Sequence, residues 1–152
     1  MRVIQNIDEL RAAAGGEIGV SDWFPVTQQL VDAFAELTQD PQWIHIDTQR
    51  AERESPFGTT VAHGFLTLSL LSHLFRQTFR FEGKQKMTIN YGFNRVRFVS
   101  PVRCGARVRL RAALQSLRDV ESGVECTWDM IIELEDSTKP AVAAEWITRI
   151  YF

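Results

Sequence analysis

The run from Ala62 to Phe79 constrains the fold more than any other part of this sequence. It is the most hydrophobic helix candidate, and a helical period spreads its apolar side chains almost all round the axis. These side chains include Phe65, Leu66, Leu68, Leu70 and Leu74. Because such a helix leaves little polar surface for solvent, we expect the rest of the chain to bury it. Its apolar run is interrupted by Thr67 and Ser69 and is too short to span a membrane.

Four strand candidates follow this helix, separated by short stretches rich in Gly, Pro, Ser and charged residues. They are Lys86–Phe98, Arg107–Leu117, Val124–Leu134 and Ala141–Tyr151. Helices followed by a run of strands indicate an α+β fold with an antiparallel sheet. A sheet wrapped around one buried helix satisfies both patterns. The length of 152 residues suits a single domain that spans residues 1–152.

The overall composition excludes several classes of function. A formal net charge of −2 gives no general attraction for nucleic acid or for an anionic membrane. The two cysteines, Cys104 and Cys126, are too few for a metal cluster or a disulfide framework. The first residues, Met1 to Arg11, contain no apolar run of the kind found in a signal peptide. We therefore expect a soluble, cytoplasmic protein.

The segment from Thr38 to His45 is the strongest candidate for chemistry. Pro41 ends a predicted helix that begins at Thr27, so Asp40 and His45 lie on one short loop where both can reach one small molecule. A water molecule between a carboxylate and an imidazole could lose a proton to one and be oriented by the other. The spacing alone also fits a structural role, with Asp40 in a turn and His45 as an ordinary loop histidine.

The second candidate is Gly64, at the start of the long helix. The first backbone N–H groups of a helix have no partner within it, and a glycine lets a ligand oxygen come close to them. This arrangement could stabilise a thioester enolate, although Gly64 could equally serve close packing. Further along, Ser69 and Ser72 lie roughly on one face of the helix. Each could bond back to the preceding turn, or one could hydrogen-bond the carboxylate of Asp40.

Other types of site are not supported by the sequence. The three histidines, at positions 45, 63 and 73, lack a zinc-like spacing and have no cysteine partner, so we expect no metal. No serine lies in a Gly-x-Ser-x-Gly context, and no Gly-rich phosphate loop is present. Arginines are dense between Arg95 and Arg111. They indicate either a solvated face of the sheet or contacts to the phosphates of a nucleotide-bearing substrate.

Together these segments resemble the MaoC-like dehydratase family, which comprises (R)-specific enoyl-CoA hydratases. The stretch Phe34–Asp47 is similar to the hydratase motif, in which Asp and His are five residues apart. The stretch Val61–Ser72 is similar to the family's Val-His-Gly helix start, with a serine nine residues after the histidine. Within the family, the nodulation-protein-N-like subgroup shares the most short sequence stretches with this chain. The shared stretches are Gln42–His45, Pro56–Thr60, Ala62–Phe65 and Asn90–Asn94.

The resemblance implies a hot-dog fold, in which a long antiparallel sheet wraps around the helix that starts near His63. It also implies a homodimer with a continuous sheet and an acyl-CoA substrate bound near the subunit interface. Coenzyme A would be part of the substrate, so no separate cofactor is expected. The implied reaction is the addition of water to the C2–C3 double bond of an enoyl thioester.

The resemblance also assigns roles to particular residues. Asp40 would take a proton from water, and His45 would orient the water and relay a proton to C2. The N–H of Gly64 would bind the thioester oxygen, and Ser72 would position Asp40. The residues expected to contact substrate are Gln42, Trp43, His63, Asn94 and Arg97. Gln42 and Trp43 replace the Asn-Pro that is common in the family, so Trp43 would narrow or reshape the acyl pocket.

Two rival functions fit the same fold. A hot-dog thioesterase would bind coenzyme A but hydrolyse the thioester. A non-catalytic acyl-CoA-binding subunit would keep the fold without the chemistry. The intact set of Asp40, His45 and Gly64 favours hydration over both rivals.

Overall fold

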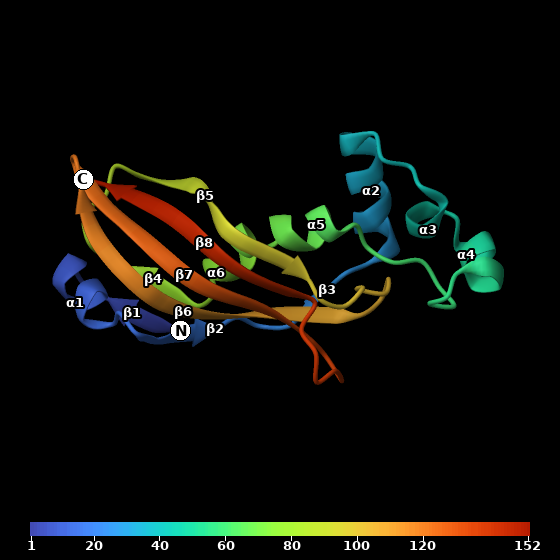
Figure 1. Ribbon diagram of the computed structural model, residues 1–152, viewed down its shortest axis with the longest axis horizontal. Coiled ribbons are helices and arrows are strands. Elements are labelled where there is room, and N and C mark those ends of the chain that lie inside the picture. Colours follow the sequence, from blue (N-terminus) through green and yellow to red (C-terminus); the bar gives the residue numbers. More distant parts are fainter.

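A computed structural model describes all residues from 1 to 152. Its elements in chain order are β1 (Arg2–Ile4), α1 (Ile7–Ala12), β2 (Gly16–Val20), β3 (Phe24–Pro25), α2 (Gln28–Thr38), α3 (Trp43–Ile46), α4 (Thr48–Glu54), α5 (Gly64–Ser69), α6 (Leu71–Phe75), β4 (Phe79–Phe81), β5 (Met87–Phe98), β6 (Arg107–Val120), β7 (Gly123–Leu134) and β8 (Val142–Tyr151). Figure 1 shows a long curved sheet, with α5 and α6 beside it and α2, α3 and α4 grouped beyond one end. None of the helices combines the length and the hydropathy that a membrane-spanning segment needs.

The main sheet is antiparallel throughout and runs in the order β2-β6-β7-β8-β5, with β3 also paired to β6. The four strands predicted from the sequence are therefore confirmed, and only β6 runs appreciably further than expected. A small parallel ribbon joins β1 to β4. Strand β5 is an edge strand, because its second side has no partner within the chain.

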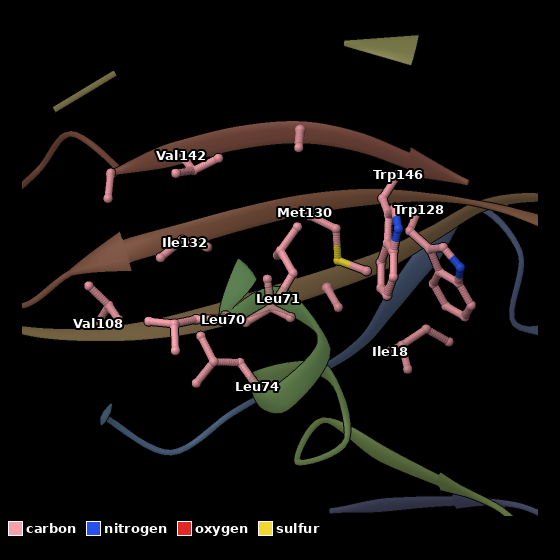
Figure 2. Close-up of a cluster of buried hydrophobic side chains, with 14 of the residues drawn as sticks. Ile18, Leu70, Leu71, Leu74, Val108, Trp128, Met130, Ile132, Val142 and Trp146 are labelled. Carbon is pink, nitrogen blue, oxygen red and sulfur yellow. The ribbon is translucent and has the colours of Figure 1, made fainter. Parts of the chain in front are cut away.

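The core lies between the inner face of the sheet and the helices α5 and α6. Figure 2 shows Leu70, Leu71 and Leu74 facing side chains of the central strands, among them Met130 and Trp146. In β8, buried and half-buried residues alternate, which is the period of a strand with one covered face. The predicted α+β fold, a sheet wrapped around a central helix, is confirmed.

The predicted single helix over Ala62–Phe79 is wrong in its details. The segment forms two short helices that meet at Leu70, and residues from Phe79 onward join strand β4. Ser69 and Thr67 donate hydrogen bonds from their hydroxyls to carbonyls four residues earlier, and such back-bonding bends a helix. The helix is also not covered on all sides, because the side chain of Phe65 is 70% exposed.

Three arginines of β6 form ion pairs on the surface of the sheet. Arg107 pairs with Glu135, just after β7, while Arg109 and Arg111 both contact Glu133 on β7, the neighbour of β6 in the sheet. The first of the two interpretations, a solvated face of the sheet, is therefore confirmed for these three residues.

Candidate functional site

His45 is held in one orientation by a backbone hydrogen bond. It lies on α3, is 7% exposed, and its Nδ1 is 2.7 Å from the carbonyl oxygen of Val61. Because a carbonyl can only accept, Nδ1 carries the proton and Nε2 keeps a free lone pair. Burial lowers the pKa of His45, as does the neighbouring His63, and these effects outweigh the bond to Val61 and the nearby Asp40. His45 therefore presents a neutral, unprotonated Nε2 at neutral pH.

Asp40 lies at the end of α2, where the chain turns sharply. Gln39 adopts a left-handed conformation with φ of 56°, and the N–H of Asp40 donates to the carbonyl of Ala35 at 3.0 Å. The predicted end of the helix ahead of Pro41 is thus confirmed. The carboxylate of Asp40 is 55% exposed and accepts no hydrogen bond from a protein group. It is free to bind a water molecule.

His63 joins these two residues. Its ring is 3% exposed and stacks on His45, with centroids 3.7 Å apart and an interplanar angle of 25°. Its Nε2 is 3.0 Å from the main-chain oxygen of Asp40 and 3.8 Å from the carboxylate oxygen Oδ2. One polar side-chain atom from each of Asp40, His45 and His63 lies within 4.8 Å of the other two. The predicted proximity of Asp40 and His45 is confirmed, and His63 is a third member of the cluster.

An apolar cleft of about 310 Å³ opens beside His45. Its lining residues are Ile44, His45, Phe57, Val61, Ala62, Gly64, Thr67, Phe98, Val99, Ser100, Pro101, Val102, Ala141 and Val142. Most of these are hydrophobic, which suits the hydrocarbon part of a ligand. Asp40 and His63 lie next to His45 but outside this lining. His45 is therefore the one ionisable side chain in the wall of the cleft.

Gly64 lies in the wall of the cleft, and its N–H has no acceptor within the chain. A Cβ atom at this position would come within 3.0 Å of the ring of Phe98. Both sequence interpretations of Gly64 thus describe a real feature: its N–H is free for a ligand, and its lack of a side chain makes room for Phe98. Phe98 itself was missed by the sequence analysis, because nothing in its strand distinguishes it from other edge residues.

A buried polar network supports the loop that carries His45. Thr60 Oγ1 donates to Gln28 Oε1 at 2.5 Å, and Gln28 Nε2 donates to the main-chain oxygen of His45 at 2.7 Å. Thr60 is almost fully buried. These contacts tie α3 to the first turn of α2 and to the segment before Val61. Thr60 belongs to the shared stretch Pro56–Thr60 but was assigned no role, and Gln28 was missed because an isolated glutamine has no distinctive spacing.

Three of the predicted site residues lie elsewhere in the single chain. Ser72 is exposed on α6, in a hollow with Asn90 and Phe93, and makes no hydrogen bond to Asp40. Asn94 donates to Glu145. Arg97 is exposed and donates to the carbonyl of Val96. The expectation that Ser72 orients Asp40 within one subunit is therefore wrong, because α6 faces a different hollow.

Arg97 misses the cleft because of the alternation of strand β5, and Asn94 misses it because the register of β5 against β8 shifts between Phe93 and Arg95. Val96 packs toward the core, while Arg97 pairs with Ala143, on the opposite face of β8 from the buried Ala144. Glu145, the partner of Asn94, also lies on that outer face. The predicted substrate contacts of Asn94 and Arg97 are therefore not available inside the cleft of the same chain.

Gln42 and Trp43 also lie outside the cleft. Gln42 is exposed and precedes α3, where its carbonyl accepts from the N–H of His45. Trp43 is half-buried and stacks under the guanidinium of Arg50, 4.3 Å from the ring centre. The residue of this segment that lines the cleft is Ile44. The prediction that Trp43 narrows the acyl pocket is therefore wrong for the single chain.

The cluster is poorly arranged for a metal ion. A metal ligand bonds through a lone pair in the plane of the imidazole ring, and the rings of His45 and His63 stack almost in parallel. Their lone pairs therefore do not converge on one point. One nitrogen of each ring is also already bonded to a backbone carbonyl.

Residues 9–133 match the MaoC-like domain. The chain belongs to this family. This MaoC-like chain is 47% identical over 150 residues to 3-hydroxyacyl-thioester dehydratase Z of Mycobacterium tuberculosis, covering 98% of each chain. It is 43% identical to nodulation protein N of Rhizobium meliloti, covering 97% of this chain and 92% of the other. The structure of an (R)-hydratase from A. caviae, involved in PHA biosynthesis, matches with a TM-score of 0.66 and 25% identity over 88% of this chain and 96% of that one.

These comparisons confirm the resemblance drawn from the motifs, both to the MaoC-like family and to nodulation protein N. They also confirm the hot-dog fold. In this MaoC-like chain, the motif residues His45 and Gly64 line one cleft, and Asp40 and His63 cluster with His45 beside it.

Proposed function

We propose that this protein is an (R)-specific enoyl-CoA hydratase, which adds water across the C2–C3 double bond of a trans-2-enoyl thioester and also catalyses the reverse dehydration. The observation that carries the proposal is the pairing of Asp40 with a neutral His45 that lines an apolar cleft. The names of the relatives, a 3-hydroxyacyl-thioester dehydratase and an (R)-hydratase, support the same reaction class.

In the proposed reaction, a water molecule lies between Asp40 and His45. It donates one hydrogen bond to the carboxylate and the other to Nε2 of His45, which is the free acceptor of that ring. The water oxygen bonds to C3 as its proton passes to Asp40. The electron pair of the double bond moves toward the thioester carbonyl. The same proton then returns from Asp40 to C2, so the elements of one water molecule are added.

This scheme changes the role first assigned to His45. A relay of a proton to C2 would require a proton on Nε2, whereas the lowered pKa of His45 favours the unprotonated nitrogen. His45 therefore orients the water, and Asp40 carries the proton. The free N–H of Gly64, in the wall of the same cleft, would bind the thioester oxygen as negative charge develops there.

We further propose that the protein acts as a homodimer. Strand β5 has an unpaired edge and exposes Met87, Ile89, Tyr91 and Phe93. An unpaired edge with exposed apolar side chains is a surface that proteins usually cover. A second copy pairing along β5 would continue the sheet. Acyl-CoA would be the only other partner, and coenzyme A would enter as part of the substrate.

The test is the hydration of crotonyl-CoA and a series of longer trans-2-enoyl-CoA substrates. We expect the ultraviolet absorbance of the enoyl thioester to fall, with (R)-3-hydroxyacyl-CoA as the product on a chiral column. A thiol reagent in a parallel assay measures free coenzyme A. Thiol release without hydration would identify the thioesterase instead. Binding of acyl-CoA without either reaction would identify a non-catalytic subunit.

A further inference from the structure

His63 is buried beside the proposed catalytic pair but does not line the cleft. Its position therefore differs from that of a residue that touches substrate. It directly precedes α5, yet its ring makes no capping hydrogen bond to that helix. Instead the ring points to Asp40 and His45, which come from the other side of the site.

The hydrogen bond from His63 fixes the backbone of Asp40 at its carbonyl end. The N–H of Asp40 is already bonded to Ala35 at the end of α2, at 3.0 Å. The carbonyl oxygen of Asp40 accepts from His63 Nε2, also at 3.0 Å. The side chain of Asp40 itself makes no hydrogen bond within the chain, so its placement depends on how firmly this backbone is held. His63 therefore contacts Asp40, as the sequence analysis expected of Ser72, but it does so at the main-chain oxygen and not at the carboxylate.

The same ring covers one face of His45. The two imidazoles are 3.7 Å apart, and Phe34 packs against His63 with centroids at 5.0 Å. The titratable groups that face His45 are Asp40, from the loop after α2, and His63, from the segment before α5. The bond to Val61 fixes His45 at Nδ1, and the stack limits rotation of its ring.

The two ring nitrogens of His63 differ in their hydrogen bonding. Nδ1 is buried and has no hydrogen-bond partner. An unpaired buried polar atom costs about 1–3 kcal/mol, and a phenylalanine would fill similar space without that cost. A purely structural ring at this position gains nothing from being histidine. The Nε2–H donor is what histidine adds.

We propose that His63 is a positioning residue of the hydratase site, which clamps Asp40 through its carbonyl and supports the ring of His45 without touching substrate. This inference rests on the proposed function. It predicts that the donor at Nε2 supports the rate of the chemical step, whereas substrate binding does not depend on His63.

The test compares two variants that separate the donor from the ring. His63→Phe keeps an aromatic ring against His45 but removes the donor. His63→Gln places an amide N–H near the position of Nε2 but removes the ring. The control is His73→Phe, which changes an exposed histidine on α6, away from the cleft. Steady-state kinetics with the best enoyl-CoA substrate and thermal unfolding are measured for all three.

For His63→Phe, we expect kcat to fall by about 10- to 100-fold with KM within about threefold, because a slight misplacement of a catalytic group has effects of this size. Its melting temperature should stay within a few degrees of the parent. His63→Gln should recover much of the lost kcat despite lower stability. A parental kcat in His63→Phe, or a rise in KM at unchanged kcat, would overturn the inference. So would a His63→Gln variant no faster than His63→Phe.

A second measurement does not depend on activity. In the ¹⁵N-labelled parent protein, NMR of the histidine side chains reports which nitrogen carries the proton. We expect the Nε2–H form for His63 and the Nδ1–H form for His45. A His63 ring protonated at Nδ1 alone would overturn the clamp. If no enoyl-CoA is hydrated by the parent protein, the proposed function fails, and the NMR result still decides the hydrogen bond to Asp40.

Discussion

Replacing Gly64 with alanine separates the two roles that this residue can have. The added methyl group would come within 3.0 Å of the Phe98 ring and would lie next to the free N–H. Overpacking a core costs about 1–3 kcal/mol. Phe98 is half exposed, so its ring can move outward, and we expect a loss of stability near the low end, about 1 kcal/mol. Loss of one oxyanion donor lowers kcat by about 10²- to 10³-fold.

The double variant Gly64→Ala/Phe98→Ala decides between packing and catalysis. Phe98→Ala alone should cost about 2 kcal/mol, roughly half the value for a fully buried phenylalanine. The double variant has no clash between the new methyl group and the Phe98 ring. Its loss of unfolding free energy should therefore be smaller than the sum of the losses in the two single variants. Catalysis should stay low, because the new methyl group still blocks the N–H. Denaturant unfolding and crotonyl-CoA hydration measure the two effects. A parental kcat in Gly64→Ala, or its return in the double variant, would refute an oxyanion role.

Three further predictions concern pH, stability and assembly. Because the pKa of His45 is lowered, kcat/KM should stay constant as pH falls below about 6.5, which is the pKa of an unperturbed histidine. A pH–rate profile in which kcat/KM already falls at or above pH 6.5 would contradict the neutral Nε2. Burial would raise the pKa of Glu125, but the hydrogen bonds from Arg118 and Arg149 outweigh it and lower the pKa. The ion pairs of Glu125 therefore stabilise the fold at pH values above its unfolded pKa, and this stabilisation is lost as pH falls through the lower folded pKa. Glu125→Gln should lower the free energy of unfolding in urea by about 1 kcal/mol at pH 7 and by much less in strong acid. An equal loss at both pH values would be inconsistent with the ion pairs. Phe93→Asp, in β5, should yield monomers in sedimentation velocity, while the control Leu37→Asp on the exposed face of α2 should leave dimers, and dimers in both would argue against assembly along β5.

The sequence predicted the elements well where the periodicity was strong. The turn-rich stretches between strands located the main sheet, and Thr27 and Pro41 marked both ends of α2. The break at Leu70 was missed, because helical periodicity does not show whether Thr67 and Ser69 bond back to the helix. The exposure of Phe65 was missed for a related reason. An apolar residue on the surface and an apolar residue in the core look the same in the sequence.

The candidate site was predicted in part. Asp40 and His45 are close in sequence, so the local turn alone brings them together. The positions of Gly64 and His63 relative to His45 depend on how the segment before α5 packs against α3. In the sequence, only the spacing of the family motif indicated this proximity. Ser72 was expected at Asp40 but lies in the hollow with Asn90, whereas His63 contacts the main-chain oxygen of Asp40, because sequence distance cannot show which way α6 or the segment before α5 faces. Gln28 supports the site from a different helix, and no local pattern could have revealed it.

The central claim is that the carboxylate of Asp40 moves the proton of the added water. The most direct test is the hydration of crotonyl-CoA by Asp40→Asn, with Asp22→Asn as the matched control. Asp22 is an exposed carboxylate between β2 and β3 whose side chain makes no hydrogen bond or ion pair. We expect kcat of Asp40→Asn to fall by about 10²- to 10⁴-fold, the usual contribution of a general base, with an unchanged circular dichroism spectrum and parental kinetics for Asp22→Asn. Turnover of Asp40→Asn within about twofold of the parent would contradict the mechanism.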